Sequence, residues 1–473
     1  MLFSKETYVE RRQRLCESVS NGLIVLFGNN ESPMNYPANA YKYRQDSTFL
    51  YFFGEHRSGL AALLDAESGE VWLAGDEIDI DDIVWYGSVH SVKAMAEETG
   101  AKGCIDMATF EERVKQAAQA GRRIHFLPPY RHDTMLAITD LLGIHHSKQR
   151  EAASLELIHA VVKLRSLKSE EEIVELEKAS AIGYKMHTAA MRLCRPGVTE
   201  QYIGGVLEGI ALAYGSHVSF QSIVSMHGEI LHGYPSATPL EKGRLLLCDA
   251  GAETNENYCS DHTRTSPIGG KFSTRQREIH DIVADCHDLA LSHARPGVRW
   301  WDVHYAVCRL MTDRLKELGL MKGDTEESVR AGAHALFLPH GLGHMMGMDV
   351  HDMEGLGQIH VGYDEETRPS SQFGINALRF ARKLEVGHVV TDEPGIYFIP
   401  DLIDLWQREG INAEFLCFDK INEYRDFGGV RIEDDVLITP DGCRFLGEET
   451  IPYRALEVEN YMAEHADASP FIL

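Results

Sequence analysis

Residues 340–352, HGLGHMMGMDVHD, bring three histidines together in the chain: His340, His344 and His351. His340 and His344 lie four positions apart, which is the spacing of the two zinc ligands in an H-E-x-x-H helix. No glutamate follows His340, however, and each of the two intervening glycines disfavours a helix by about 1 kcal/mol relative to alanine. The stretch therefore indicates a cluster of imidazoles outside a metalloprotease helix, and its meaning depends on which residues join it.

Three apolar stretches on either side of this cluster predict strands that each carry a carboxylate. They are RLLLCDAG (244–251), HVVTDEPGIYF (388–398) and GVRIEDDVLIT (429–439), which contain Asp249, Glu393 and Glu433. A charge buried without a partner is costly, so each needs a reason. One such carboxylate is ordinarily a turn former or an ion-pair partner. Three of them, with Asp261 in DHTRT and the histidines, favour a metal site.

The number of carboxylates suggests how many ions such a site would hold. Four converging carboxylates carry four negative charges, so a single divalent ion would leave half of them uncompensated, whereas two ions would neutralise the set. Oxygen ligands suit Mn²⁺ or Mg²⁺, and one imidazole shifts the preference toward Mn²⁺, Co²⁺ or Zn²⁺. Paired ions about 3.5–4 Å apart serve hydrolytic enzymes, so we expect a dinuclear hydrolytic site.

The composition argues against several classes of protein. The 46 Lys and Arg against 72 Asp and Glu give a formal net charge of -26, so neither nucleic acid nor an anionic membrane is an expected partner. The N-terminal MLFSKETYVERRQRLCESVSNG lacks the apolar region of a signal peptide, and no run of roughly 18 apolar residues predicts a membrane span. Nine cysteines without a CxxC pair indicate reduced thiols, so we expect a cytoplasmic protein.

The length of 473 residues predicts more than one domain, and residues 1–165 are expected to form an N-terminal α/β domain. Its predicted strands are 22–28, 47–54 and 59–77. FEERVKQAAQAG (110–121) is a predicted helix that ends at a glycine. The charged KLRSLKSEEE marks the predicted boundary, after which residues 166–473 form the second domain.

The second domain shows signs of an internal duplication. Residues 169–194 predict a long helix, because Ser169 is a suitable N-cap and three glutamates follow it. The tetrapeptide RPGV at 195–198 recurs at 295–298, and in both places a predicted helix runs into Pro-Gly and another helix follows. This repeat predicts two related half-domains.

Five motifs resemble, in order, the ligand motifs of the pitta-bread metallopeptidases, which include aminopeptidase P (Xaa-Pro aminopeptidase) and prolidase (Xaa-Pro dipeptidase). The matching residues are Asp249 in DAGAE, Asp261 in DHTRT, His344 in HGLGH, Glu393 in TDEPGIYF and Glu433 in RIEDD. The resemblance implies an α/β (α+β) fold, with an aminopeptidase P/creatinase-like N-terminal domain followed by a pseudo-twofold pitta-bread catalytic domain. The N-terminal YRQDSTFLYFFG is similar to that family's first domain.

The resemblance also implies an activity and its cofactors. It implies hydrolysis of the bond between an N-terminal residue and proline, with two divalent ions, foremost Mn²⁺ and otherwise Co²⁺ or Zn²⁺. His344 would be the imidazole ligand, and Glu393 would be both a ligand and a proton shuttle. His340 and His351 would lie beside the scissile peptide, and His351 would help to stabilise the oxyanion.

Three further residues receive roles from the same resemblance. Arg431 would pair with a carboxylate of the site and hold Glu433 in place. His232, in GEILHGYP, would contact the substrate. Arg379, in ALRFARK, resembles the prolidase arginine that grips the carboxylate of the product proline, although it could also be a surface arginine.

Two departures from the family pattern are expected to be harmless. Asp249 and Asp261 lie twelve positions apart instead of the usual eleven, and a turn around residues 255–257 can absorb the extra residue. Asp392 stands where a small or aliphatic residue is common. Since neighbouring side chains of a strand face opposite ways, Asp392 should point away from the metals.

Several alternatives stay open from the sequence. Arg379 and EPGIYFIP favour a prolidase restricted to dipeptides, whereas YRQDSTFLYFFGEHRSGLAALLD and DAGAETN favour an aminopeptidase P that accepts longer peptides, and we favour the latter. Creatinase-like members lack the metal ligands, and methionine aminopeptidases usually lack the N-terminal domain. A non-catalytic binding protein of this fold is a distant alternative.

The family suggests a homodimer or a homotetramer.

Overall fold

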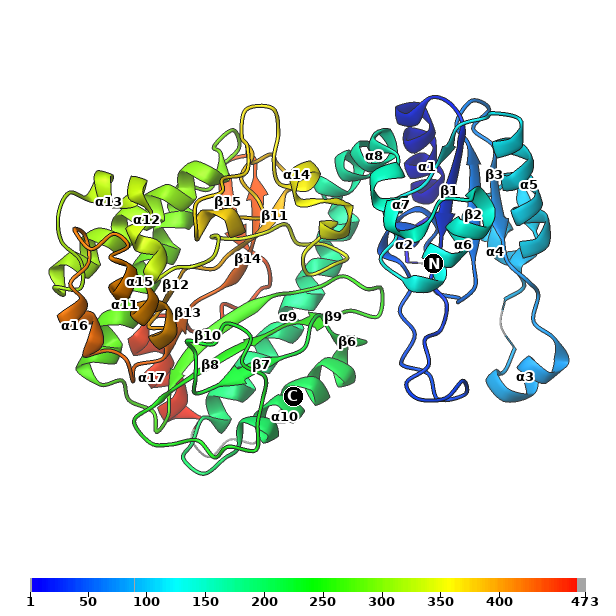
Figure 1. The fold of residues 1–473 in the computed structure, drawn as a ribbon. Helices are drawn as coiled ribbons and strands as arrows, with labels where there is room; N and C mark the ends of the chain where they lie inside the picture. Colours follow the sequence, from blue (N-terminus) through cyan, green and yellow to red (C-terminus); the bar gives the residue numbers. More distant parts are fainter. Residues whose placement is uncertain (1, 89, 466–473) are drawn as a thin grey trace. The chain divides into compact units, whose positions relative to one another are not determined.

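The structure is a computed structural model that describes residues 2–88 and 90–465. The chain divides into two compact units. The first comprises Met1–Arg165 together with Met353–His360, and the second comprises Ser166–Asp352 and Val361–Leu473. Each unit has helices and sheets of its own, which are coloured along the chain in Figure 1.

The first unit is an α/β structure built on one sheet. Its strands are β1 (Leu23–Phe27), β2 (Ala61–Asp65), β3 (Val71–Ala74), β4 (Gly103–Ile105) and β5 (Ile124–His125), in the order β4-β3-β2-β1-β5. Its helices are α1 (Lys5–Val19), α2 (Ser47–Phe53), α3 (Ile80–Tyr86), α4 (Val92–Thr99), α5 (Met107–Gln119), α6 (His132–Leu142), α7 (His146–Ala152) and α8 (Leu155–Ser166). Phe110 and Val114 of α5 pack against Val25 and Leu63 in its core. Their four-residue spacing puts both on one face of that helix.

Two sequence predictions in this unit differ from the structure. The stretch 59–77 contains two antiparallel strands, β2 and β3, joined by a turn, instead of one strand. The run at 47–54 was expected to be a strand, but Ser47–Phe53 forms helix α2. The side chain of Asp46 accepts a hydrogen bond from Phe49 N (2.8 Å) as the N-cap, and Gly54 ends the helix in the left-handed region at φ 65°. Every residue of α2 is buried, so the apolar run could not distinguish a buried helix from a buried strand.

The second unit contains two related sets of helices and strands. Its helices are α9 (Glu170–Leu193), α10 (Glu200–Tyr214), α11 (Thr274–His293), α12 (Trp300–Glu317), α13 (Thr325–Ala331), α15 (Pro400–Glu409), α16 (Phe418–Asn422) and α17 (Ala455–Glu464), with 3-10 turns η1 (Ala333–Leu336) and η3 (Ile375–Ala377). Its strands are β6 (His217–Val218), β7 (Ile223–Ser225), β8 (Leu245–Ala250), β9 (Ala252–Glu253), β10 (His262–Pro267), β11 (Val389–Asp392), β12 (Gly395–Tyr397), β13 (Gly429–Arg431), β14 (Asp434–Thr439) and β15 (Gly442–Phe445). Two short helices, η2 (Glu354–Leu356) and α14 (Gln358–Val361), begin in the segment that groups with the first unit.

The sheets of the second unit also come in two sets. One has the order β10-β8-β7 and the other β11-β14-β15, with all neighbours antiparallel. Helix α9 packs on β8 and β10, and helix α11 packs on β11 and β15 (Figure 1). An isolated bridge between Thr263 and Glu433 connects the strands of the two sets.

The duplicated RPGV segment folds the same way twice. Gly197 and Gly297 have φ values of 88° and 86°, in the left-handed region that favours glycine. Gly197 N donates to Leu240 O (2.9 Å), and Gly297 N donates to Leu384 O (2.8 Å). Each turn joins two packed helices, α9 to α10 and α11 to α12. The predicted internal duplication and pseudo-twofold fold are therefore confirmed.

The start of α9 also follows the sequence prediction. The Ser169 side chain accepts from Glu172 N, and the Glu172 side chain accepts from Ser169 N, which completes a capping box. Within residues 2–88 and 90–465, every helix is too short or too polar to cross a membrane.

Candidate metal centre

The five predicted ligands come from both halves of the second unit. Asp249 lies in β8 and Asp261 directly precedes β10. Glu393 directly follows β11, and Glu433 lies between β13 and β14. His344 lies in the loop before β11. Two hydrogen bonds hold this loop to β11: Thr391 N donates to His344 O (2.9 Å), and His344 N donates to Thr391 Oγ1 (3.0 Å).

Three of the five offer ligand atoms that lie within 4.8 Å of one another: Asp261, His344 and Glu433. The His344 Nε2 atom lies 3.5 Å from Asp261 Oδ2 and 3.8 Å from Glu393 Oε1. All three residues of the cluster are buried, and the side chain of Glu393 is 19% exposed. The structure therefore brings residues 172 positions apart in the chain into one group.

The ring of His344 is oriented with Nε2 toward the carboxylates. Its Nδ1 lies 3.2 Å from the carbonyl oxygen of Met345. A carbonyl can only accept, so Nδ1 carries the proton and Nε2 keeps its lone pair. Burial lowers the pKa of His344 well below its usual value, so the ring is neutral at pH 7. A neutral imidazole with a free Nε2 lone pair is the form that binds metal.

Arg431 holds the carboxylates in place. It is 4% exposed and donates from Nη2 to Asp249 Oδ2 (2.5 Å). Its Nε donates to Thr263 Oγ1 (3.0 Å), and Thr263 Oγ1 donates to Glu433 Oε2 (2.7 Å). One guanidinium thus orients Asp249 directly and Glu433 through a threonine, in the way that supporting residues orient metal ligands.

Asp261, Glu393 and Glu433 are buried close to other carboxylates, and their pKa values are raised. Burial, then Glu433 and Asp249, raises the pKa of Asp261 well above the usual range. Burial, then Glu393, raises the pKa of Glu433, and burial raises the pKa of Glu393 to about 7 against the opposing charge of Arg431. Burial and neighbouring carboxylates both disfavour a negative charge that lacks a compensating cation.

The donor set fits a divalent metal ion. Asp249 Oδ1 and Asp261 Oδ1 are buried and have no hydrogen-bond partner among the described residues. Leaving such an oxygen unsatisfied is costly, and a cation would satisfy both atoms. Carboxylate oxygens with one imidazole nitrogen suit ions such as Mn²⁺, Co²⁺ or Zn²⁺.

A second chain of hydrogen bonds reaches His340. Arg431 Nη1 donates to the Tyr397 hydroxyl (2.8 Å), which lies 2.9 Å from His340 Nε2. His340 Nδ1 lies 2.7 Å from Gly341 O, so Nδ1 is the donor and the tyrosine donates to Nε2. Burial, then Arg431, lowers the pKa of His340 to about 3, so this ring is neutral at pH 7. His340 Nδ1 also lies 3.6 Å from Glu393 Oε2, beside the cluster.

The sequence did not single out Tyr397 or Thr263. A signal was present for Thr263, because it follows Asp261 by two positions and even spacings share a face in extended chain. Nothing in the sequence, however, indicated that Arg431 would reach both side chains.

The other predicted residues lie around the cluster. The rings of His351 and His344 have centroids 4.1 Å apart. His232 is exposed on the segment between β7 and β8, and its charged form would oppose protonation of His340. Arg379 is half-buried, and its charge acts on His340, His344 and Glu393.

Both departures from the family pattern behave as expected. Residues 254–258 form a turn in which Asn257 N donates to Thr254 O (3.0 Å) and Asn257 takes φ 64°. Asp392 is fully buried, and its Oδ2 lies 3.9 Å from His287 Nε2 of α11. Thr391 Oγ1 donates to Glu393 Oε1 (3.4 Å), so the side chains of Thr391 and Glu393 lie on the same side of the chain. Asp392, between them, points to the opposite side, away from the cluster.

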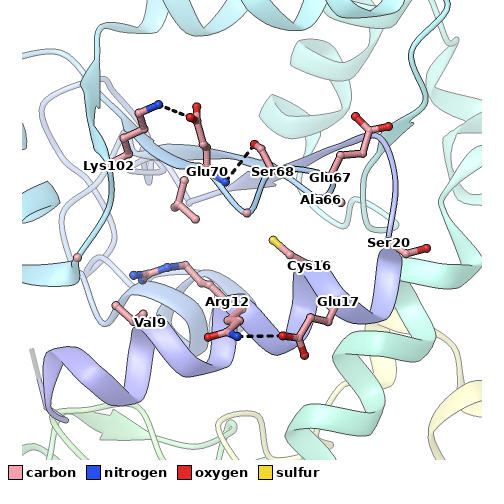
Figure 2. Close-up of a pocket in the computed structure, with 14 residues that line it drawn as sticks. Val9, Arg12, Cys16, Glu17, Ser20, Ala66, Glu67, Ser68, Glu70 and Lys102 are labelled. Atoms are coloured by element: carbon pink, nitrogen blue, oxygen red, sulfur yellow. Dashed lines mark hydrogen bonds and ion pairs between the residues drawn. The ribbon is translucent and has the colours of Figure 1, made fainter.

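The first unit has a cavity of about 790 Å³, lined by α1 and the β2–β3 turn (Figure 2). Lys102 on its wall pairs with Glu70. Arg12 donates to Phe52 O (2.7 Å). Burial raises the pKa of Cys16 to about 11, so this thiol stays protonated at pH 7. Cys16 is therefore not an activated nucleophile in this cavity.

Comparison with known proteins identifies the family. The model of metallopeptidase family M24 matches residues 174–440, which is more than half of the chain. The chain belongs to metallopeptidase family M24. A second model, the aminopeptidase P N-terminal domain, matches residues 8–125 of this M24 protein.

Relatives of this M24 metallopeptidase extend over almost the whole chain. It is 28% identical to the Xaa-Pro dipeptidase of Homo sapiens, over 96% of this chain and 92% of that protein. It is 31% identical to the Xaa-Pro aminopeptidase of Escherichia coli, over 93% of each. The low-pH form of E. coli aminopeptidase P superimposes with a TM-score of 0.80 at 30% identity, covering 98% of this chain and 99% of that one. A zinc-substituted E. coli aminopeptidase P in complex with product gives 0.79 at 29% identity, with the same coverage.

These comparisons confirm the predicted family and fold. The M24 protein is a metal-dependent peptidase with an N-terminal aminopeptidase P-type domain and a catalytic domain of mixed helices and sheets. The distant alternative of a non-catalytic binding protein finds no support.

Proposed function

We propose that this M24 protein hydrolyses the peptide bond between an N-terminal residue and proline, in peptides of three or more residues as well as in dipeptides. The observation that carries this proposal is the buried convergence of Asp261, His344 and Glu433 beside Glu393 and Asp249. The names of the relatives support proline specificity, because both the human and the E. coli protein act on Xaa-Pro bonds.

The residues that would hold the metal ions are Asp249, Asp261, His344, Glu393 and Glu433. We infer two divalent ions, with Mn²⁺ foremost and Co²⁺ or Zn²⁺ as alternatives, because four carboxylates need about four positive charges. Bound ions would polarise the scissile carbonyl and lower the pKa of a water molecule toward neutrality.

The chain's own residues would move the proton and bind the peptide. Glu393, whose carboxylate is partly exposed, would take a proton from the attacking water and give it to the proline nitrogen as the bond breaks. His351, whose ring lies tilted beside that of His344, would donate to the developing oxyanion. His340, kept neutral by burial and hydrogen-bonded to Tyr397 at Nε2, would donate from Nδ1 to a substrate carbonyl after releasing Gly341 O. Arg431 would keep the carboxylates oriented.

Two residues would contact the rest of the substrate. The exposed His232, whose charge acts on His340, would contact the peptide near that residue. Arg379 would bind a substrate carboxylate, since its charge acts on three groups of the site and a guanidinium suits a carboxylate. A dipeptidase restricted to Xaa-Pro remains the second candidate, and the human relative and Arg379 favour it.

The proposal extends to assembly and location. Four apolar side chains of α3 are highly exposed: Ile80 at 70%, Val84 at 71%, Trp85 at 81% and Tyr86 at 77%. Exposed apolar clusters of this kind mark association surfaces, so they support a homodimer or a homotetramer. Free cysteines in the described chain support a reducing, cytoplasmic location. Residues 1–165 would then be the N-terminal domain and 166–473 the catalytic domain.

The experiment compares four substrates with the Mn²⁺-loaded protein: an Xaa-Pro dipeptide, an Xaa-Pro-Yaa tripeptide, and the same peptides with alanine in place of proline. We expect release of Xaa from both proline peptides and little from the alanine peptides. Cleavage of the dipeptide alone would establish the dipeptidase alternative. Equal cleavage of proline and alanine peptides would overturn proline specificity.

A further inference from the structure

A second cluster of potential ligands lies in the second unit, and it shares no residue with the carboxylate cluster. It consists of His304 and Cys308, one turn apart on α12, and His334 on η1. Their exposed fractions are 1%, 0% and 2%. Each offers one ligand atom, and these atoms lie within 4.8 Å of one another. The hydrolysis proposed above uses none of these side chains.

The spacing inside this His304–Cys308–His334 cluster suits a metal ion. His304 Nε2 lies 3.5 Å from Cys308 Sγ. For comparison, the bond lengths of tetrahedral zinc, about 2.0–2.1 Å to nitrogen and about 2.3 Å to sulfur, separate two such ligand atoms by about 3.6 Å. His334 adds a buried Nδ1 that has no hydrogen-bond partner among the described residues. A thiol–imidazole hydrogen bond explains the first pair, but it does not account for His334.

The protonation states favour ligation at neutral pH. Burial lowers the pKa of His304 to about 3, and it lowers the pKa of His334 to about 4, so both rings are neutral and keep a lone pair. Burial raises the pKa of Cys308, so the group is a thiol without metal. Ion binding would break the S–H bond, form a metal–sulfur bond and release one proton to solvent, with no change of oxidation state.

The charge balance selects the kind of ion. One thiolate and two neutral imidazoles carry a single negative charge in a fully buried place. A monovalent cation makes the complex neutral, whereas a divalent cation would leave an uncompensated positive charge away from water, which is costly. Thiolate and imidazole ligands select Cu⁺ among soft monovalent ions. We propose that His304, Cys308 and His334 bind one Cu⁺ ion.

The position of this cluster gives the ion a structural consequence. Phe337, directly after η1, accepts a hydrogen bond at its carbonyl from Tyr397 N (2.9 Å). Tyr397 in turn bonds His340 through its hydroxyl. An ion shared by α12 and η1 would therefore tie helix α12 to the segment that leads to His340. Binding to the folded state alone raises the melting temperature, so copper should stabilise the protein.

The test titrates the metal-free full chain with Cu⁺ under anaerobic conditions against a coloured Cu⁺ chelator, and then records X-ray absorption of the copper. We expect one tightly bound Cu⁺ with one sulfur and two nitrogen neighbours. Cys308→Ser should lose the sulfur neighbour in the absorption spectrum. Its affinity for Cu⁺ should fall by more than the roughly 10–100-fold that is typical when a residue supporting a ligand is lost. The matched control is Cys286→Ser, because Cys286 is equally buried on α11 with its Sγ 3.9 Å from Val307 O. This control should bind copper like the unaltered protein.

Two further variants keep the result interpretable. His334→Gln removes one proposed ligand from a short 3-10 turn, where a substitution should disturb folding less than inside helix α12. It should weaken Cu⁺ binding, and this can be measured even if Cys308→Ser does not fold. Glu433→Gln, in the carboxylate cluster, should leave Cu⁺ binding unchanged, which separates this site from the hydrolytic one. Cu⁺ binding undiminished in Cys308→Ser or His334→Gln would overturn the proposal. Zn²⁺ bound through this sulfur with no bound Cu⁺ would overturn the choice of ion.

Discussion

Asp249 and Glu393 occupy equivalent positions in the two halves of the second unit. Leu240 N donates to Val198 O (2.7 Å) and Leu384 N donates to Val298 O (2.8 Å), so the two leucines correspond. Asp249 lies nine residues after Leu240, and Glu393 lies nine residues after Leu384. Each half therefore contributes one carboxylate at the equivalent position: Asp249 near the end of β8, and Glu393 directly after β11.

The remaining carboxylates repeat the same relationship. Asp261 directly precedes β10, the antiparallel partner of β8, and Glu433 directly precedes β14, the antiparallel partner of β11. His344 lies outside this pairing, since it comes from the loop before β11. Duplication thus accounts for two pairs of oxygen ligands, and one imidazole breaks the symmetry.

Replacing Arg431 by lysine should disorder the carboxylates. A lysine ammonium cannot make the separate bonds that Arg431 makes to Asp249, Thr263 and Tyr397. We expect Arg431→Lys to lower metal affinity or kcat/KM by roughly 10–100-fold, measured by metal titration and peptide hydrolysis. Arg425→Lys is the matched control, because Arg425 pairs with Asp404 at the surface. An equal effect in both variants would contradict this role for Arg431.

Replacing Tyr397 by phenylalanine should affect turnover and spare the metal. The change removes the hydroxyl that accepts from Arg431 and donates to His340, which leaves both partners unsatisfied. The loss of about 1–1.5 kcal/mol for such a bond predicts a fall of roughly tenfold in kcat with unchanged metal content. Tyr424→Phe, in another buried tyrosine, should retain full kcat. Loss of metal in Tyr397→Phe would show that the hydroxyl supports the ligands instead.

Arg379 provides a test of substrate length. If its guanidinium binds the free carboxylate of an Xaa-Pro dipeptide, Arg379→Gln should raise the KM for the dipeptide about tenfold, equivalent to about 1.4 kcal/mol, and change the KM for an Xaa-Pro-Yaa-Yaa peptide much less. Lys383→Gln is the control, since Lys383 pairs with Glu366 in an exposed ion pair. The proposal fails if the KM values for both peptides rise equally.

The stability of the chain should fall in mild acid. Burial lowers the pKa of His187 and of His280 to about 3, whereas an unfolded histidine titrates near 6.5. Below pH 6.5 the unfolded chain therefore binds protons that the folded chain does not, so the stabilisation is complete above pH 6.5 and is lost as the pH falls. Each ring should cost about 2 kcal/mol of unfolding free energy between pH 6.5 and 5.

Chemical denaturation at several pH values measures this slope. His280→Gln should flatten it by the share of one histidine, and His146→Gln, in an exposed residue, should not. An unchanged slope in His280→Gln would show that its ring takes up a proton in the folded state.

The sequence predicted much of this molecule because its signals were local. The capping box at Ser169 and the repeated RPGV turns depend on contacts between near neighbours, so their patterns could be recognised. The run at 47–54 also has local cap residues, Asp46 and Gly54, but a helix buried on every side has no polar face, so its apolar residues resembled a buried strand. Tyr397 and Thr263 gain their positions from Arg431, which lies far from both in the chain, and no local pattern records such a contact.

The most direct test counts Mn²⁺ ions per chain while hydrolysis of an Xaa-Pro-Yaa tripeptide is followed in the same titration. The predicted result is two bound ions, with activity that rises as they bind. Glu433→Gln should lose metal and activity, because Glu433 is a buried member of the cluster, whereas the exposed Glu448→Gln should retain both. Full hydrolysis by the metal-free protein or by Glu433→Gln would contradict the assignment of this cluster as the catalytic metal centre.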